Sequence, residues 1–182
     1  MNKKKYVIPD YILGKDIKEV RCSLGLTQRE FAQYLHCSKP TVERWEMSTE
    51  AIRGPIVVLI DILKKQPDLY HDVVVPAKLT PVRLWYMHEQ TPCTMIDVDD
   101  RKRNVTIKNY TEHLMFRAFG VNESPTYAQY EEFLESRCFP RTRDKMKLIL
   151  QELNIPFYDP FLIIEKTEGR MAEYHFWIKI ER

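Results

Sequence analysis

The sequence has no apolar run that approaches the ~20 residues required to span a membrane, and it shows no signal peptide. Its four cysteines are dispersed, with no pair at C-x-x-C spacing, and its five histidines do not complete a metal-binding set. A Gly-rich phosphate loop is missing, and no Ser or Cys nucleophile has a recognisable His partner. These absences predict a cytoplasmic protein with free thiols, no metal or other cofactor, and no enzymatic activity.

One acidic cluster leaves a cation site open as an alternative. Asp97, Asp99 and Asp100 lie close together near an expected turn, where their carboxylates could hold a cation. The tip of a charged hairpin is the commoner explanation for such a pattern, and we favour it here.

The length of 182 residues fits one large domain or two small ones, and 44% hydrophobic residues suffice for packed cores. Pro67, Pro76 and Pro81 punctuate a stretch that disfavours both helix and central strand. We therefore expect domains at 1–76 and 77–182. The net charge of +2 is unevenly divided, since residues 1–65 hold 12 Lys and Arg against 8 Asp and Glu, and the rest holds 16 against 18. The positive excess thus lies in the first domain, although chance scatter explains it equally well.

A helix, a tight turn and a second helix are expected between Leu24 and Met47. Thr27 and Glu30 have the spacing of a capping box at the start of the first helix. Ser38 is placed to cap the second helix, and Pro40 lies in its first turn, where the missing N–H costs nothing. Val42 and Trp45 should face inward, and the outward face then carries Ser38, Lys39, Pro40, Thr41 and Arg44.

This stretch resembles the helix-turn-helix of Xre/Cro-family repressors over about residues 12–66. The residues that carry the resemblance are Leu26-Thr27-Gln28, Ala32, Ser38, Thr41-Val42 and Arg44-Trp45-Glu46. The sequence departs from the family in the turn, where His36 replaces the usual Gly. Within the family it is most similar to the DNA-binding half of MqsA-type antitoxins, on residues 42–46, Gly54-Pro55 and 64–69. Only a short tail precedes residue 12, so we expect no counterpart of that family's zinc-binding half.

The resemblance implies that the second helix enters the major groove of double-stranded DNA. Arg44 can offer two donors to guanine, while Lys39 and Thr41 can reach a base or a phosphate. Gln28, as in the family, should bind a phosphate through its side chain and the helix N-terminus. The set of expected DNA-contacting residues is Thr27, Gln28, Ser38, Lys39, Pro40, Thr41 and Arg44. Glu46 is expected instead to orient an arginine within the fold.

Further helices are expected at about 13–23 and 55–65, with a short one near 68–72. The helix at 55–65 is apolar nearly all round, which suggests a homodimer interface unless the second domain covers it. The first domain should thus be a lambda-repressor-like bundle of four to five helices. The three lysines within residues 1–5 form either a basic arm or, more simply, a solvated tail.

The second domain should be α+β, making the whole chain mainly α with a smaller β part. Strands at 82–87, 93–98 and 104–108 predict an antiparallel meander, and a last strand is expected at 174–181. Between them we expect four short helices: one around 114–119 that ends at Gly120, one after Thr126, one that begins at Thr142 or Asp144, and one after Asp159. The basic run 137–145 could grip a phosphate or an acidic partner. We favour ion pairs of Arg137, Arg141 and Arg143 with Asp144 and nearby glutamates.

Three functions fit these observations. The first is a sequence-specific DNA-binding regulator, a repressor and homodimer. The second is an antitoxin whose residues 82–182 bind a toxin. The third is a one-component regulator that senses a ligand through the same residues. The operator, the partner and the signal are not encoded in any pattern that we recognise.

Overall fold

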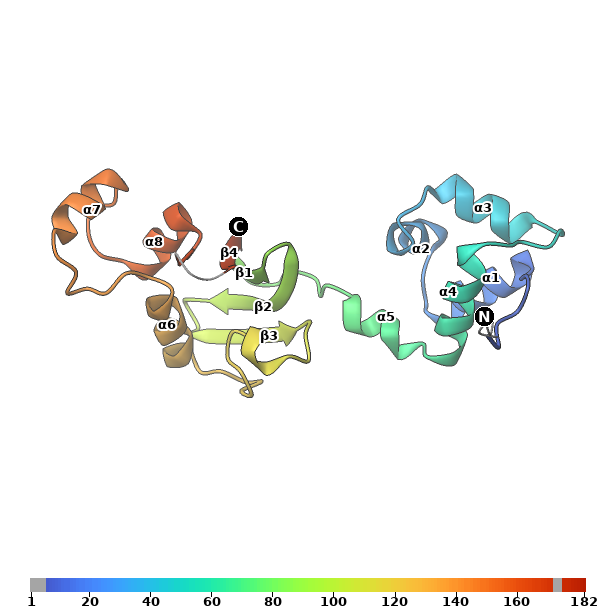
Figure 1. Ribbon diagram of the computed structural model, residues 1–182, viewed down its shortest axis with the longest axis horizontal. Coiled ribbons are helices and arrows are strands. Elements are labelled where there is room, and N and C mark those ends of the chain that lie inside the picture. The colour runs from blue at the N-terminus through green and yellow to red at the C-terminus, as the bar shows by residue number, and fades with distance from the viewer. Residues whose placement is uncertain (1–5, 172–174) are drawn as a thin grey trace, which may run out of the picture. The chain divides into compact units, whose positions relative to one another are not determined.

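The computed structural model describes residues 6–171 and 175–182, which divide into two compact units, Met1–Val75 and Pro76–Arg182 (Figure 1). The boundary inferred from the prolines, after residue 76, differs from this division by one residue. The lysine-rich tail at residues 1–5 and the first residue of the expected last strand, Tyr174, lie outside the described residues.

The N-terminal unit contains the five helices that the sequence predicts. They are α1 (Gly14–Ser23), α2 (Gln28–Tyr34), α3 (Lys39–Met47), α4 (Pro55–Lys65) and α5 (Asp68–Val73). Their apolar faces meet in one core, whose fully buried side chains include Ile17, Phe31, Val42 and Ile60. Before α1, Ile12 pairs with Ile52 in an isolated antiparallel bridge, which fastens the N-terminal lead-in to the loop before α4.

Two left-handed residues end the first two helices of this unit. Gly25 follows α1 with a φ of 70°, as the glycine at that position predicts. His36 follows α2 with a φ of 50°, so the turn adopts the left-handed conformation without the usual glycine. The turn closes through a hydrogen bond from the Cys37 N–H to the Ala32 carbonyl at 2.9 Å. His36 thus takes the left-handed conformation that the family's glycine would favour at this position.

The C-terminal unit is built on a four-stranded antiparallel sheet. Its strands are β1 (Val82–His88), β2 (Thr91–Asp99), β3 (Asn104–Asn109) and β4 (Phe176–Glu181), in the order β3-β2-β1-β4. The meander of the first three strands was predicted. The strand nearest the C-terminus joins the sheet beside β1, with Tyr86 opposite Ile178. Only the fold brings these residues together, because about ninety positions separate them in the chain.

Helices α6 (Tyr127–Ser136) and α8 (Pro160–Thr167) pack on one face of this sheet, and α7 (Met146–Glu152) lies between them in the chain. Tyr130, Phe133 and Leu134 of α6 and Ile163 and Ile164 of α8 are buried with sheet residues in the second core. The prediction of a mainly α chain with a smaller β part is therefore confirmed.

Two helix predictions in this unit are wrong in detail. The segment before Gly120 forms only a 3₁₀ turn, η1 (Leu114–Phe116), because Arg117 leaves the helical region with a ψ of 140°. The third expected helix begins at Met146, later than Thr142 or Asp144, since Lys145 is left-handed with a φ of 59° and blocks an earlier start.

Of the three ion pairs expected in the basic run 137–145, that of Arg141 is confirmed, since its guanidinium lies 2.6 Å from the Glu135 carboxylate. Arg137 was expected to pair with an acid. Its guanidinium instead donates from Nη2 to the carbonyls of Gly169 and Phe176, at 2.9 and 3.0 Å. Arg143 lies over the ring of Phe139 rather than against Asp144. Arg137 therefore ties α6 to the segment around β4 and is unavailable for a phosphate.

The acidic cluster near the β2–β3 turn is distributed among separate partners. Asp97 forms a buried bidentate ion pair with Arg83 across β1 and β2, at 2.6 and 2.7 Å. Asp100 accepts a hydrogen bond from the hydroxyl of Tyr127 at 2.9 Å. Among the described residues, no group of His, Cys, Asp and Glu has a metal-binding arrangement. Within the same ranges, no helix combines the length and the apolar character needed to cross a membrane.

Candidate DNA-binding surface

Helix α3 begins as its sequence predicts. The side chain of Ser38 accepts a hydrogen bond from the Thr41 N–H, and the two hydroxyls lie 2.9 Å apart. Pro40 is exposed in the first turn. Val42 is fully buried beneath the helix, whereas Trp45 packs against the core and stays only half-buried, less than expected. The hydroxyls of Ser38 and Thr41 therefore hydrogen-bond within the first turn of α3. The burial of Val42 determines which face of α3 points outward.

The outward face of α3 carries Lys39 and Arg44 as its exposed cations. The Lys39 ammonium lies 2.7 Å from the Glu43 carboxylate, one turn further along the helix. The side chain of Arg44 makes no ion pair or hydrogen bond with any described residue. The guanidinium of Arg44 can therefore reach a base edge without breaking an internal contact, whereas Lys39 must exchange Glu43 for a phosphate.

Gln28, at the start of α2, lies in a network that sequence reasoning did not foresee. Its side-chain amide donates to Glu46 Oε2 at 2.8 Å. Glu46 also accepts two hydrogen bonds from the Arg21 guanidinium, from Nε at 2.6 Å and from Nη2 at 3.1 Å. The expectation that Glu46 orients an arginine is confirmed. The expectation that the Gln28 side chain is free for a phosphate needs revision, because one of its donors is already engaged.

The hydrogen bonds of this network stabilise the charged form of Glu46. Burial alone would raise the pKa of Glu46, but hydrogen bonds from Arg21 and Gln28 outweigh burial, and the pKa is lowered. Arg21 also donates to the Leu26 carbonyl at 2.8 Å, so α1, the start of α2 and the end of α3 are joined. The network fixes α3 relative to α1 and α2, which is a positioning role.

Thr27 caps α2 as predicted, and its partner Glu30 brings a carboxylate to the same place. Glu30 Oε2 accepts from the Thr27 N–H at 2.8 Å and from its hydroxyl at 2.7 Å. These hydrogen bonds lower the pKa of Glu30. The negative charge beside Thr27 and Gln28 would repel a phosphate, which argues against the predicted phosphate contact at this edge.

The seven predicted residues do lie on neighbouring elements. Ser38, Lys39, Pro40, Thr41 and Arg44 belong to α3 or its cap, and Thr27 and Gln28 begin α2, which packs directly against α3. Sequence reasoning missed two contributors to the electrostatics of this surface, Glu30 and the Lys39–Glu43 pair. The four-residue spacing of Lys39 and Glu43 on one helix was the signal that could have revealed the pair.

Residues 17–60 match a family described as helix-turn-helix. This part of the chain is an Xre/Cro-type helix-turn-helix domain. The match covers α1 to the middle of α4 and includes every predicted DNA-contacting residue. No curated protein and no solved structure matched the chain, so the narrower resemblance to MqsA-type antitoxins stays a prediction. The helix-turn-helix domain supports DNA binding, and its second helix in the motif is α3.

Proposed function

We propose that this protein is a sequence-specific transcriptional regulator that represses by occupying an operator through α3. The observation that carries the proposal is the helix-turn-helix domain itself, with Arg44 exposed and unpaired among the described residues on the outward face of α3. A helix of this kind fits the major groove, where an arginine can bond to both guanine acceptors. Catalysis has no part in this proposal.

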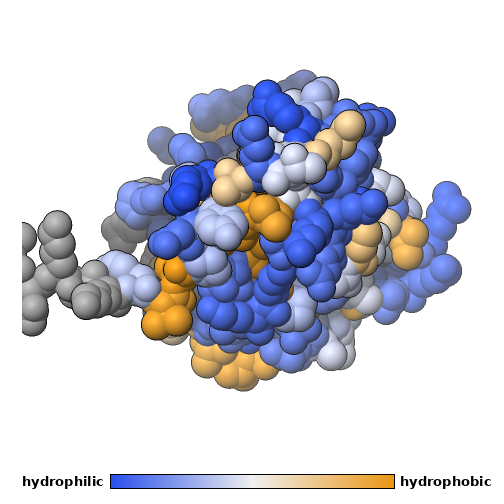
Figure 2. Space-filling model, turned by 90° about the vertical axis from the view of Figure 1, so that its right-hand side faces the viewer, coloured by the Kyte–Doolittle hydropathy of each residue, from blue (hydrophilic) through white to orange (hydrophobic). Residues whose placement is uncertain are grey.

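The proposed regulator is a homodimer that reads an inverted repeat. On α4, Val57, Ile60 and Leu63 are buried, while Val58 and Ile62, one turn apart, are each 40% exposed. The face seen in Figure 2 is mostly hydrophilic, with separate hydrophobic patches. A second copy would cover Val58 and Ile62 and place two recognition helices about one DNA turn, ~34 Å, apart.

The binding experiment compares DNA from upstream of the protein's own gene with a shuffled duplex of the same composition, at moderate salt. Tighter binding to the upstream DNA supports the proposal, and equal binding to both overturns it. The dimer is tested separately by light scattering on the Ile62→Lys variant. We expect a monomer from that variant and an unchanged state from Val121→Lys, which alters an exposed apolar residue of the other unit.

A second candidate function is ligand sensing through the C-terminal unit, and a cavity in that unit favours it. In that case a ligand shifts operator affinity. The antitoxin role is a third candidate, motivated by the MqsA-like sequence of the helix-turn-helix domain. Co-purification of a neighbouring gene product with residues 82–182 would support the antitoxin role, and a chain recovered alone would count against it.

A further inference from the structure

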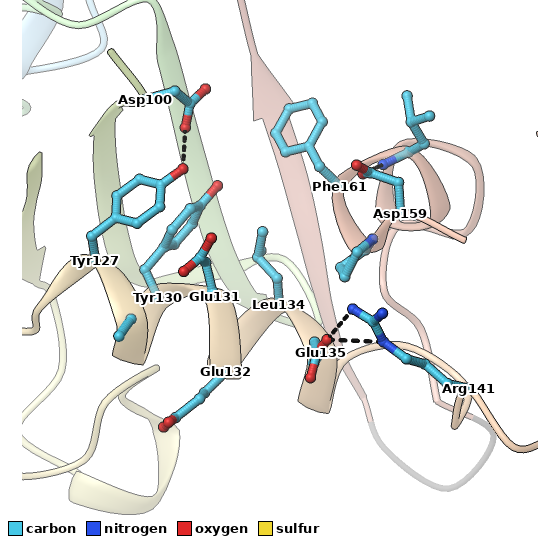
Figure 3. A pocket seen from close by; sticks show the side chains of 13 residues that line it. Asp100, Tyr127, Tyr130, Glu131, Glu132, Leu134, Glu135, Arg141, Asp159 and Phe161 are labelled. Carbon is cyan, nitrogen blue, oxygen red and sulfur yellow. Dashed lines mark hydrogen bonds and ion pairs between the residues drawn. The ribbon is translucent and has the colours of Figure 1, made fainter. Parts of the chain in front are cut away.

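A cavity of about 730 Å³ opens between α6 and α8 in the C-terminal unit. Its walls come from α6, the first turn of α8 and Asp100 of the β2–β3 turn (Figure 3). Small-molecule sites in proteins occupy roughly 300–1,000 Å³. The cavity therefore has the size of a ligand site, and every residue that lines it belongs to a single compact unit.

The lining of this cavity is strongly acidic. Arg141 is the one cation among its lining residues, and the carboxylates are those of Asp100, Glu131, Glu132, Glu135 and Asp159. Two of them are matched within the chain, Glu131 by Arg103 at 3.2 Å and Glu135 by Arg141 at 2.6 Å. The other three carboxylates, of Asp100, Glu132 and Asp159, form no ion pair with any described residue. Asp100 accepts from the Tyr127 hydroxyl, and Asp159 accepts from the Leu162 N–H at the start of α8.

Aromatic rings lie between these carboxylates. Figure 3 shows Tyr127 and Tyr130 on the side of Asp100, and Phe161 toward Asp159. Arg103, which does not line the cavity, lies 4.3 Å from the centre of the Tyr127 ring while it pairs with Glu131. A ring face beside a carboxylate is an arrangement that binds organic cations. The Tyr127 ring and the Glu131 carboxylate therefore already bind one organic cation, the guanidinium of Arg103.

The Tyr130 hydroxyl gives an independent indication of a ligand site. Tyr130 is only 3% exposed, yet its hydroxyl makes no hydrogen bond to any described residue. Among the described residues, Arg137 Nε is the only side-chain polar atom that is both inaccessible and without a hydrogen-bond partner. Because the Tyr130 hydroxyl oxygen also lacks a partner but does not belong to that class, it must be accessible from the cavity. Burial, followed by the nearby carboxylates, raises the pKa of Tyr130, which keeps the hydroxyl protonated and neutral. It can accept a hydrogen bond from a ligand's ammonium group.

We propose that this cavity binds a small organic polycation, of the aliphatic di- or polyamine class. One ammonium group would lie by Asp100 and the Tyr127 and Tyr130 rings, and another by Asp159 and Phe161. The methylene chain between them would run along the apolar wall that Leu134 and Pro160 contribute. In Figure 3 Asp100 and Asp159 lie on opposite sides of the cavity, with Leu134 between them, which matches the two ends and the methylene chain of a linear diamine.

The cavity also excludes other ligand classes. An anion would meet five carboxylates against one arginine, and an apolar molecule would leave those carboxylates without water. A basic peptide could satisfy the rim charges. It would not, however, need the buried Tyr130 hydroxyl at the wall, which a compact ligand inside the cavity reaches. The small polycation is therefore the class that uses every feature of the site.

The experiment is calorimetric titration of the full-length protein with spermidine, in low-salt buffer without DNA. We expect saturable binding to one site that weakens as salt is raised, because exposed charge pairs are screened. The Tyr130→Phe variant, which removes only the hydroxyl, should bind about three- to tenfold more weakly. The Asp100→Asn and Asp159→Asn variants should each lose about tenfold or more, since a charge-assisted hydrogen bond becomes a neutral one. Asparagine at position 159 still caps α8.

Controls separate the site from a general effect of negative charge. Asp144→Asn removes one carboxylate from the same unit outside the cavity, and Tyr158→Phe removes a hydroxyl that bonds the Phe139 carbonyl instead. Both variants should bind spermidine like the parent, and unchanged circular dichroism and melting confirm that all variants are folded. Trilysine and Mg²⁺ serve as competing probes.

The outcomes divide clearly. Site-specific weakening in the three cavity variants, with normal controls, supports the proposal. It is overturned if spermidine does not bind, or if the cavity variants bind like the parent. Tighter binding of trilysine than of spermidine would assign the cavity to a basic segment of a protein partner. Displacement of spermidine by equimolar Mg²⁺ would assign it to an inorganic cation. None of these results depends on whether the protein binds an operator.

Discussion

The guanidinium of Arg21 donates to both carboxylate oxygens of Glu46, from Nε at 2.6 Å and from Nη2 at 3.1 Å, across 25 residues of sequence. The pair joins α1 to α3, and Gln28 completes it from α2. Because an ion pair with matched geometry fixes orientation, it sets the angle at which the outward face of α3 is presented. The outward face of α3 is thus oriented by Arg21 and Glu46, which are not among the expected DNA contacts, together with Gln28, which is.

Acid should destabilise the N-terminal unit through Glu46. Its pKa is lowered in the folded state, so the folded protein binds fewer protons than the unfolded chain. The stabilisation is complete above the ordinary glutamate value of 4.5 and is lost as the pH falls through the lowered value. The free energy of unfolding should therefore fall below about pH 4.5. It is measured by urea unfolding, with Trp45 fluorescence as the signal in a Trp85→Phe, Trp177→Phe background.

The control for this prediction is Glu46→Gln in the same background. It should be less stable at neutral pH by about 1–3 kcal/mol and should depend less steeply on acid pH. Asp16 and Glu30 also have lowered pKa values, so only the difference between parent and variant reports Glu46. Parallel pH profiles would show that the Arg21–Glu46 pair contributes nothing to acid stability.

Arg44→Ala should weaken operator binding by about 1–3 kcal/mol and relax specificity at one base pair. The reason is that Arg44 is exposed on α3 and free of internal partners among the described residues. Arg44→Lys is the matched control, because lysine keeps the charge but lacks the planar fork that binds guanine. Fluorescence anisotropy on operator variants measures both. If Arg44→Lys keeps full specificity, Arg44 contacts a phosphate and not a base.

Glu43→Gln should strengthen binding to all duplex DNA a few-fold. The substitution releases Lys39 from its 2.7 Å ion pair and removes a negative charge from the outward face of α3. Asp61→Asn is the matched control, since it breaks the comparable Lys65–Asp61 pair at 2.6 Å on α4 with the same change in net charge. Stability should change little in either variant, because exposed pairs contribute about 0–1 kcal/mol. Equal gains in both variants would point to net charge alone.

Gly14→Ala should destabilise the N-terminal unit by about 1–3 kcal/mol. A Cβ at this position would collide with the Trp45 carbonyl and lie 2.7 and 2.8 Å from the carbonyls of Ser48 and Glu46. These are backbone atoms, so α1 must move away from the end of α3. Chemical denaturation of Gly14→Ala beside Lys15→Ala, an exposed neighbour on the same helix, measures the cost. Similar midpoints would mean that α1 and α3 can separate freely.

Local patterns predicted most of the secondary structure, because capping and turn formation depend on neighbours in the chain. Thr27 and Ser38 cap the helices that they were expected to cap, and Thr126 and Asp159 cap helices that were expected to begin there. The helix expected before Gly120 was wrong, since its apolar spacing fitted a helix while the backbone turned at Arg117. For the candidate DNA-binding surface, the sequence predicted that Lys39, Thr41 and Arg44 lie on one helix, but it did not predict that Gln28 bonds to Glu46 or that Glu30 brings a carboxylate to this surface.

The sequence by itself determined the helix-turn-helix, because that motif is encoded within about thirty consecutive residues whose caps, turn and apolar face can be read directly. Only the tertiary structure decided which charges meet. Arg21 and Glu46 come together through packing of α1 against α3, and Asp100 and Asp159 reach the cavity beside Tyr130 from segments far from α6 in the chain. Pairing of this kind depends on distance in space, which no local spacing in a sequence encodes.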